Sequence, residues 1–323
     1  MSDNLFFITG RGRSGSWLLK SILDSHPEIS VAPEALFLIN LKSKYGKVIE
    51  WTDRVKLSFY NDLIKERKII DWWNVDLVQL KSKVFEASRE SVYQNMILIP
   101  YELYRQHQKK EEKALLADKN PEYSLHIDYL SSLFPASKFI ALVRDPRDNI
   151  SSYKKVKFDS NDNYSLAYRW YYYNNAILDA KAKLKEKLLI IRFEDLLLKS
   201  VETLQEICNF LELHYHDDLL KFYESPKNVL DWNSKITKPL DQSLAFRWKK
   251  ENNNIGIELS ICKDIMDKFG YDTEGIKDLK PSLKYRYLKG SFVTRLEIFF
   301  FKLPYGLRQF VLEKYRVKTK ILK

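Results

Sequence analysis

The chain has 323 residues, of which 45% are hydrophobic and 30% are charged, the composition of a soluble globular protein. No apolar run approaches the length of a membrane span, and the N-terminus lacks the basic and apolar regions of a secretory signal. Two cysteines without a CxxC motif argue against a disulfide framework or a zinc cluster. We therefore expect a cytoplasmic protein without a structural metal centre.

Positive charge is concentrated near the C-terminal end. Residues 280–323 hold twelve Lys/Arg and two Asp/Glu, a net of +10, whereas the other residues hold 42 and 41 and are nearly neutral. A regional excess of this kind does not indicate a nucleic-acid partner. Large apolar residues alternate with these charges, which suits a helix lying on an anionic membrane surface. A helix packed on the core, or a protein interface, is equally compatible with the pattern.

The first elements are a strand, a glycine-rich turn and a helix. Residues 5–8 form a short apolar run, and three glycines follow within six residues. Apolar periodicity then predicts a helix over residues 14–25 and a short extended segment over residues 29–32. Residues 36–113 have a mainly helical pattern and are a candidate substrate cap, although a structural helical layer fits as well.

Further strands and helices alternate along the rest of the chain. After a turn cluster at 117–123, the patterns predict helices over 125–134, 164–186 and 197–211, and strands over 138–144 and 188–193. Such alternation predicts a parallel sheet with helices on both faces. We therefore expect an α/β fold in which residues 1–279 form a domain with a P-loop-like central parallel sheet flanked by helices. Residues 36–113 of this domain would form the helical cap, and residues 280–323 would form a basic helical C-terminal extension.

The glycine-rich turn is a candidate anion site. A turn of this kind presents backbone N–H groups of a helix N-terminus to a ligand. Gly10 and Gly15 have the separation found in the phosphate loop of nucleotide hydrolases, but Ser16 and Trp17 replace the lysine and the magnesium-binding hydroxyl. The turn can therefore still bind an anion, but it lacks the lysine and hydroxyl that Mg²⁺–nucleoside triphosphate chemistry needs. This argues against a P-loop kinase.

Four motifs give the chain a family resemblance. They are Gly10–Leu19 with Leu23–Ile29, Phe139–Ser152, Ile191–Leu196, and Ile236–Asp241 with Arg247 and Trp248. Together they resemble sulfotransferases that use 3′-phosphoadenosine 5′-phosphosulfate (PAPS), and within that superfamily the bacterial carbohydrate-type and tyrosyl-protein-type branches. The resemblance covers roughly residues 5 to 270, and the first two motifs are the specific ones.

This resemblance implies a site for the two anionic ends of PAPS, with the nucleotide 3′,5′-bisphosphate PAP as product and no metal requirement. The residues implied for the nucleotide are Arg11, Gly12, Arg13, Ser14, Gly15, Ser16, Trp17, Arg144, Ser152, Phe193, Lys238 and Arg247. The turn N–H groups, Arg13 and Ser16 would hold the phosphosulfate. Arg144 lies at a strand end and Ser152 two turns into the next helix, so the two can converge on the 3′-phosphate.

Catalytic residues are implied as well. Sulfuryl transfer builds charge on the leaving phosphate, so alignment and electrostatic stabilisation dominate, as in phosphoryl transfer. Glu34 falls on the catalytic glutamate of the tyrosyl-protein branch and is the implied general base, with a helix cap or surface carboxylate as the alternative. Lys119 and Arg13 would stabilise the leaving phosphate, although Lys119 also fits an exposed turn lysine. His26 is interpreted as a structural residue of its turn.

We therefore expect a PAPS-dependent sulfotransferase that acts on the hydroxyl of a carbohydrate or glycolipid. A peptide tyrosine is the competing acceptor, because Glu34 and Lys119 follow the spacing of the tyrosyl-protein branch. A P-loop kinase or nucleotide-binding protein, and a non-catalytic membrane-associated protein, are the alternatives from other classes. Residues 281–323 would bring the enzyme to the inner face of a membrane as a peripheral protein.

Overall fold

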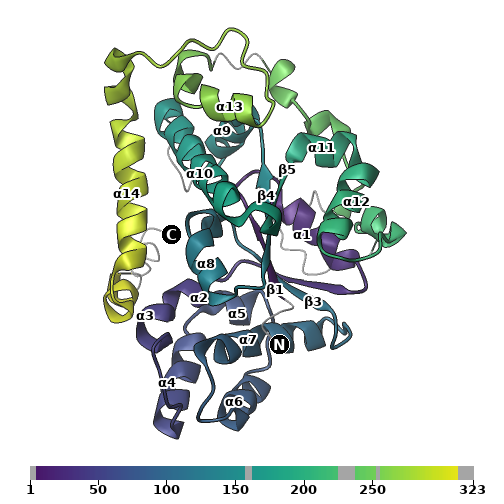
Figure 1. Cartoon of the computed structure of the whole chain (residues 1–323), viewed down its shortest axis with the longest axis vertical. Helices are drawn as coiled ribbons and strands as arrows, with labels where there is room; N and C mark the ends of the chain where they lie inside the picture. Colours follow the sequence, from purple (N-terminus) through teal and green to yellow (C-terminus); the bar gives the residue numbers. More distant parts are fainter. Residues whose placement is uncertain (1–4, 157–161, 225–236, 252–254, 312–323) are drawn as a thin grey trace. The chain divides into compact units, whose positions relative to one another are not determined.

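A computed structural model describes residues 5–156, 162–224, 237–251 and 255–311 (Figure 1). The chain divides into two compact units. The first unit comprises residues 1–34 and 104–291, and the second comprises residues 35–103 and 292–323. All five strands of the sheet belong to the first unit, which is therefore the unit that carries the candidate site.

The first unit is built on a five-stranded parallel sheet with the strand order β2–β3–β1–β4–β5. The strands are β1 (Leu5–Thr9), β2 (Ile29–Ala32), β3 (Leu115–Lys119), β4 (Lys138–Val143) and β5 (Leu188–Arg192). Strand β1 lies at the centre, and all five of its residues are buried. Strands covered on both faces are expected to be continuously apolar, as β1 and β4 largely are.

Strand β3 corrects the sequence analysis, which expected a turn over residues 117–123. Residues 117–119 belong to the strand, and the turn begins after them. The charged side chains of Asp118 and Lys119 interrupt the apolar pattern expected of a buried strand, yet both residues are fully buried. The hydroxyl of Tyr123 donates to Asp118 Oδ2 at 2.9 Å, and the ammonium of Lys119 pairs with Glu34. Partners brought in by the fold therefore make two buried charges tolerable in a strand.

The helices of the first unit agree with the predicted alternation of strands and helices. Its α-helices are α1 (Ser16–Ser25), α8 (Ile127–Leu133), α9 (Pro146–Lys154), α10 (Asn163–Leu184), α11 (Phe193–Leu198), α12 (Ser200–Phe210) and α13 (Lys263–Lys268). Its 3₁₀ turns are η2 (Pro121–Leu125), η3 (Lys185–Lys187), η4 (Asp217–Lys221), η6 (Gln242–Leu244), η7 (Arg247–Lys249), η8 (Ile257–Ile261) and η9 (Pro281–Tyr287). The helix predicted over 197–211 is two helices, α11 and α12, which are separated at Lys199.

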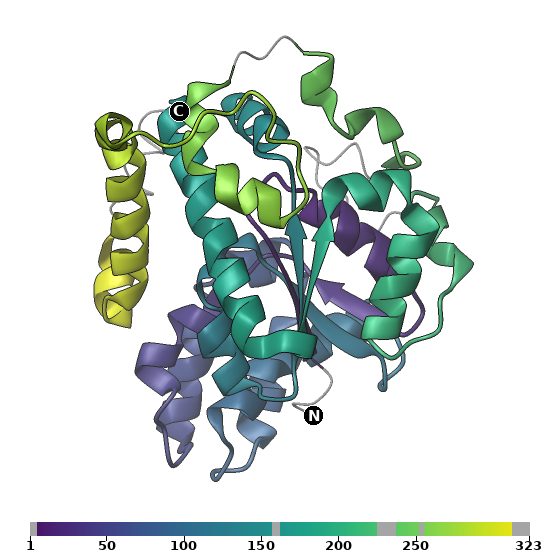
Figure 2. The same cartoon turned by 45° about the horizontal axis from the view of Figure 1, so that its top comes forward.

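Helices cover both faces of this sheet (Figure 2). On one face, apolar residues of α1, α11 and α12 form a continuous buried cluster with Phe6, Ile8 and Ile140 of the strands. On the other face, Phe7 stacks on Phe139 with ring centroids 5.1 Å apart, and the long helix α10 buries Trp170. Successive side chains of β1 thus pack into hydrophobic cores on opposite faces of the sheet. This packing holds the strand ends in fixed positions.

The second unit is helical among its described residues. It contains α2 (Phe37–Asn40), α3 (Lys42–Tyr45), α4 (Asp53–Leu63), α5 (Arg67–Asp71) and α6 (Leu77–Glu86), whereas α7 (Tyr93–His107) and α14 (Leu288–Lys302) contribute residues to both units. Its core is aromatic, with Trp51 and Trp73 fully buried. Arg308 donates to the side chain and the carbonyl of Asn40, which ties the C-terminal segment to the helical region that the sequence analysis treated separately.

No helix among the described residues combines the length and apolarity needed to cross a bilayer. The cytoplasmic location and the membrane contact expected from the sequence therefore stay predictions.

Candidate active site

The turn between β1 and α1 has a conformation that glycine makes accessible. Gly10, Arg13 and Gly15 have φ angles of 138°, 64° and 95°. A Cβ at Gly10 would lie 2.2 Å from the carbonyl oxygen of Leu142, and one at Gly15 would lie 2.4 Å from the ring of Phe193. The chain can follow this path only with hydrogen at both positions. Ser16, the first residue of α1, is buried directly beyond the turn.

Side chains from neighbouring helices brace this turn. The amide of Asn149 in α9 donates to the carbonyl of Gly12 at 3.0 Å and to the hydroxyl of Ser14 at 3.3 Å. The guanidinium of Arg11 donates to the carbonyl of Leu166 at 2.7 Å, and the residue is buried. The Arg11 side chain thus points into the fold, and its predicted contact with a nucleotide stays a prediction. Asn149 was missed as a bracing residue, since nothing local marks it.

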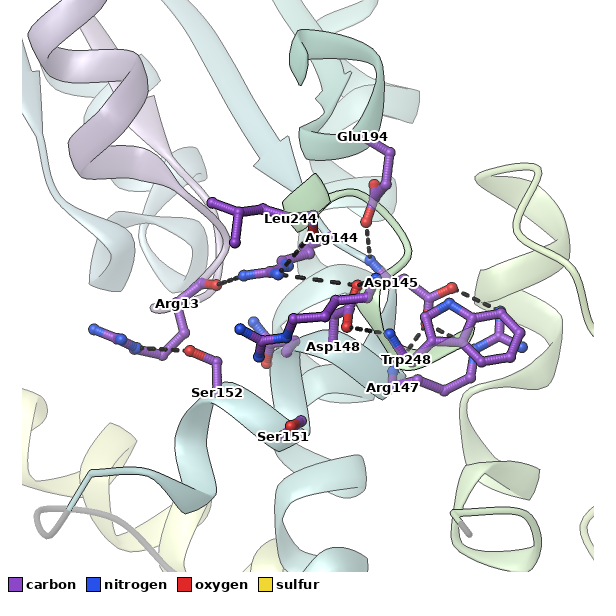
Figure 3. A network of polar contacts seen from close by, with 12 residues as sticks. Arg13, Arg144, Asp145, Arg147, Asp148, Ser151, Ser152, Glu194, Leu244 and Trp248 are labelled. Carbon is purple, nitrogen blue, oxygen red and sulfur yellow. Dashed lines mark hydrogen bonds and ion pairs between the residues drawn. The ribbon is translucent and has the colours of Figure 1, made fainter. Parts of the chain in front are cut away.

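The turn between β4 and α9 brings Arg144 to the first turn (Figure 3). Arg144 Nη1 donates to the carbonyl of Arg13 at 3.3 Å, and Arg13 Nε donates to the hydroxyl of Ser152 at 3.1 Å. The guanidinium of Arg144 lies 4.4 Å above the ring of Phe193. Three residues predicted from two separate motifs, Arg13, Arg144 and Ser152, thus form one contiguous basic cluster at adjacent strand ends.

Arg144 is a buried cation with unused hydrogen-bonding capacity. The residue is 7% exposed, and its Nε has no hydrogen-bond partner among the described residues. Burial lowers the pKa of the guanidinium, and the nearby carboxyl groups of Asp148 and Glu194 act against this shift. The closest oxygen of Asp148 is 3.9 Å from Nη2. An additional anion beside Arg144 would complete its coordination, because buried charges are stable only when they are paired.

A later segment of the chain covers this cluster. Arg247 and Trp248 donate their backbone N–H groups to Asp148 of α9, and the Arg147 guanidinium lies 3.5 Å above the Trp248 ring. Arg247 forms an ion pair with Glu251, with Nε and Oε1 3.0 Å apart. Lys238 is exposed, and its predicted role stays a prediction. Ile236, the first residue of that motif, lies outside the described residues.

Behind the arginines lies a buried carboxyl group that the sequence analysis did not single out. Glu194 accepts hydrogen bonds from the Asp145 amide at 3.1 Å and from the Tyr271 hydroxyl at 2.8 Å. Burial raises the pKa of Glu194 to about 7, and these hydrogen bonds act against the shift. Asp145 also caps α9 and holds the guanidinium of Arg147 through both of its carboxylate oxygens. The acidic Glu194-Asp195 pair after β5 was the only local sign of this support.

Glu34, two residues after β2, meets Lys119, the last residue of the neighbouring strand β3. Their Oε1 and Nζ atoms are 2.6 Å apart, with side-chain exposures of 23% for Glu34 and zero for Lys119. The Lys119 ammonium also lies 3.8 Å from the ring centroid of Trp17, the second residue of α1. Lys119 is therefore a buried strand residue and not an exposed turn lysine. Two of the three predicted catalytic residues, Glu34 and Lys119, thus lie at the same edge of the sheet as the glycine-rich turn, which contains the third, Arg13.

His26 has a structural position, as the sequence analysis interpreted it. One ring nitrogen lies 2.9 Å from the carbonyl of His214, and the other accepts the Glu28 amide at 3.1 Å. Burial lowers the pKa of its imidazole. Among the residues that the structure describes, no cluster of three His, Cys, Asp or Glu side chains could hold a metal ion.

Comparison with known proteins identifies the family. A model of the sulfotransferase family matches residues 6–217. The chain belongs to the sulfotransferase family. It is therefore an enzyme of the sulfuryl-transfer class, and the P-loop-like parallel sheet is the fold of that family.

Individual relatives refine this picture. Protein-tyrosine sulfotransferase A of Caenorhabditis elegans is 23% identical over 283 residues, covering 82% of this chain and 67% of its own. Protein-tyrosine sulfotransferase 1 of Danio rerio is 23% identical over 288 residues, covering 83% and 72%. The solved sulfotransferase domain of the Synechococcus PCC 7002 olefin synthase superposes with a TM-score of 0.60 at 26% identity, covering 83% and 94%. The chain is thus similar to sulfotransferases over most of its length.

Proposed function

We propose that this sulfotransferase moves the sulfuryl group of PAPS to the hydroxyl of a tyrosine in a protein or peptide. The observation that carries the proposal is the ion pair between the buried Lys119 and the partly exposed Glu34, beside the glycine-rich turn. The names of the curated relatives support tyrosine as the acceptor over the carbohydrate hydroxyl expected from the sequence. A glycan or glycolipid acceptor becomes an outcome of the test.

The residues present fit a donor with two anionic ends. The turn after β1 offers backbone N–H groups and Arg13 for the phosphosulfate end. Arg144, a buried cation whose Nε has no partner among the described residues, and the hydroxyl of Ser152 suit the 3′-phosphate. When bound, the donor supplies the activated sulfuryl group. The roles of Arg11, Gly12, Ser14, Ser16, Trp17, Phe193, Lys238 and Arg247 toward the nucleotide are part of the same proposal.

In this mechanism, Glu34 accepts the proton of the acceptor hydroxyl as its oxygen bonds to sulfur. The bond between sulfur and the bridging phosphate oxygen breaks at the same time, which leaves PAP and a sulfate ester. Lys119 and Arg13 stabilise the negative charge on the departing phosphate. Before reaction, the ion pair with Lys119 holds the Glu34 carboxylate in place, with Nζ and Oε1 2.6 Å apart.

The test is incubation of the full chain with ³⁵S-labelled PAPS and a panel of tyrosyl peptides, glycans and glycolipids. We expect label on tyrosine, and Glu34→Gln to lower turnover by about a hundredfold or more while PAP affinity is nearly unchanged. Glu50→Gln, which alters an exposed carboxylate of the second unit, is the matched control. Label on glycans alone would contradict the acceptor. No transfer, together with calorimetric binding of Mg²⁺–ATP, would favour a P-loop kinase.

We propose further that the C-terminal helix binds an anionic membrane surface. Five large apolar residues repeat at intervals of three or four along η9 and α14, and all are exposed: Tyr285, Leu288, Phe292, Leu296 and Phe299. At 100° per residue, those of α14 form one stripe, with Arg295 and Lys302 at one border and Lys289 at the other. Gly290 and Thr294, on the opposite side, are buried.

Charge decides which partner suits this stripe. Residues 280–323 carry a net charge of +10, so two copies meeting through it would repel each other, whereas an anionic bilayer would attract it. Co-sedimentation with phosphatidylglycerol and phosphatidylcholine vesicles tests this. We expect binding to the anionic vesicles only, lost in Phe292→Ser/Phe299→Ser and kept in the control Ile49→Ser/Val78→Ser, which also alters exposed apolar residues. Equal sedimentation with both lipids would contradict the proposal.

A further inference from the structure

Asp148 has an unusual position in the site (Figure 3). The residue is fully buried in α9, and its two carboxylate oxygens accept the backbone N–H groups of Arg247 at 3.1 Å and Trp248 at 2.9 Å. It lies four residues after Arg144 and four before Ser152, so it is placed between the two groups proposed for the 3′-phosphate. No local pattern in the sequence predicts this contact, because 99 residues separate Asp148 from Arg247.

The segment that Asp148 holds is in contact with the same arginine. Arg144 Nη2 donates to the carbonyl of Leu244 at 3.4 Å, and lies 3.9 Å from Asp148 Oδ2. Between these contacts, Phe246 has a left-handed backbone with φ of 49°, which is unfavourable for a phenylalanine. The two N–H groups on Asp148 and the carbonyl on Arg144 therefore fix a strained turn from both of its ends.

From this geometry we infer that Asp148 is a positioning residue, which holds residues 241–251, and Arg247 with them, over the 3′-phosphate position. The inference rests on the proposed function, because the proposed function is what places the 3′-phosphate at Arg144 and Ser152. A carboxylate is the side chain suited to this task, because it accepts two N–H groups at once. The amide of asparagine has only one acceptor oxygen, so its NH₂ group would oppose one of the two backbone donors.

A helix cap elsewhere in the chain provides the contrast with a purely structural role. The carboxylate of Asp76 also accepts two backbone N–H groups, from Val78 at 2.8 Å and Gln79 at 3.1 Å, at the start of α6. Asp76 belongs to the second unit and has no assigned part in the site. Both N–H groups at Asp76 go to Oδ1, so asparagine can retain them there, whereas at Asp148 each oxygen accepts one donor and asparagine loses one of them. Asp76→Asn therefore controls for the loss of a capping carboxylate's charge alone.

The experiment compares Asp148→Asn with Asp76→Asn by calorimetric titration with PAP and with adenosine 5′-phosphate, which lacks the 3′-phosphate. We expect Asp148→Asn to weaken PAP binding about tenfold and to change adenosine 5′-phosphate binding less than about threefold. Asp76→Asn should leave both affinities unchanged. A double-mutant cycle with Arg247→Ala should show strong non-additivity for PAP, since Asp148 acts through that segment. Equal weakening for both nucleotides, or additive effects, would overturn the inference.

Hydrogen exchange on the unmodified protein tests the inference if Asp148→Asn does not fold. PAP should slow amide exchange within residues 241–251 more than adenosine 5′-phosphate does, and equal protection by the two nucleotides would overturn it. The two proposals fail in different ways. If the unmodified protein does not bind PAP, the proposed function fails. If it binds PAP and Asp148→Asn binds PAP equally well, only the role of Asp148 fails.

Discussion

The β1–α1 turn and the β4–α9 turn both deliver arginines to the site, but they are built by different means. The first depends on its own backbone, with positive φ angles at Gly10, Arg13 and Gly15. The second depends on buried charged side chains, as Asp145 holds Arg147 and Asp148 holds a distant segment. The first turn is therefore set mainly by its backbone conformation, braced by Asn149, and the second by buried charged side chains, so different perturbations should break them.

The largest effect is expected for Gly10→Ala in the first turn. The new Cβ would lie 2.2 Å from the carbonyl oxygen of Leu142 at a backbone φ of 138°, so we expect a loss of about 3 kcal/mol or more in the free energy of unfolding. The control is Gly275→Ala, where φ is 75° and no atom lies within 4 Å of the new Cβ. That change should cost about 1 kcal/mol. Similar losses in urea unfolding would show that Gly10 is not sterically required.

A comparable effect, dependent on pH, is expected at the support of the second turn. The pKa of Glu194 is raised to about 7, so the folded state retains a proton that the unfolded chain releases near pH 4.5. Its stabilising contribution is complete below that pH and disappears as the pH rises through 7, a change on the order of 3 kcal/mol. Urea unfolding at pH 5 and pH 8 should show this loss relative to Glu194→Gln. Identical pH dependence in both proteins would contradict the assignment.

Nucleotide affinity separates the two turns directly. Arg144→Ala should weaken binding of PAP about thirtyfold, because a charge-assisted contact to the 3′-phosphate is lost, and should affect adenosine 5′-phosphate far less. Arg13→Ala should weaken both nucleotides to a similar extent, since both have a 5′-phosphate. Calorimetric titration measures both ratios. If Arg144→Ala weakened the two nucleotides equally, the second turn would not distinguish the 3′-phosphate.

The smallest effect is expected where the first turn contacts helix α9. Ser152 accepts a single hydrogen bond from Arg13 Nε at 3.1 Å near the surface. Ser152→Ala should weaken PAP binding by about threefold and change the free energy of unfolding by less than about 0.5 kcal/mol. Titration and urea unfolding of this variant measure both quantities. A loss as large as that of Arg144→Ala would mean that Ser152 organises the arginines and is more than one donor among several.

Much of the fold could be predicted from the sequence because its signals are local. The strands β1, β4 and β5, the glycine-rich turn and the long helix α10 lie close to their predicted bounds. Strand β3 could not be predicted, because the buried charges of Asp118 and Lys119 are tolerated only through Tyr123 and Glu34. The break between α11 and α12 at Lys199 was also missed, since apolar periodicity continues across it.

The features of the candidate site also divide into those with local sequence signals and those that depend on tertiary contacts. The sequence by itself determined the turn after β1 and the strand-end position of Arg144, because a buried strand, three glycines and an Asp-Pro helix start are read from neighbouring residues. Only the tertiary structure decided that Arg11 points inward, that Lys119 is a buried partner of Glu34, and that Asp148 holds a segment 99 residues away. Each of these depends on which charged groups meet in the interior of the protein. A buried charge is stable only where the fold brings a partner within hydrogen-bonding distance of it.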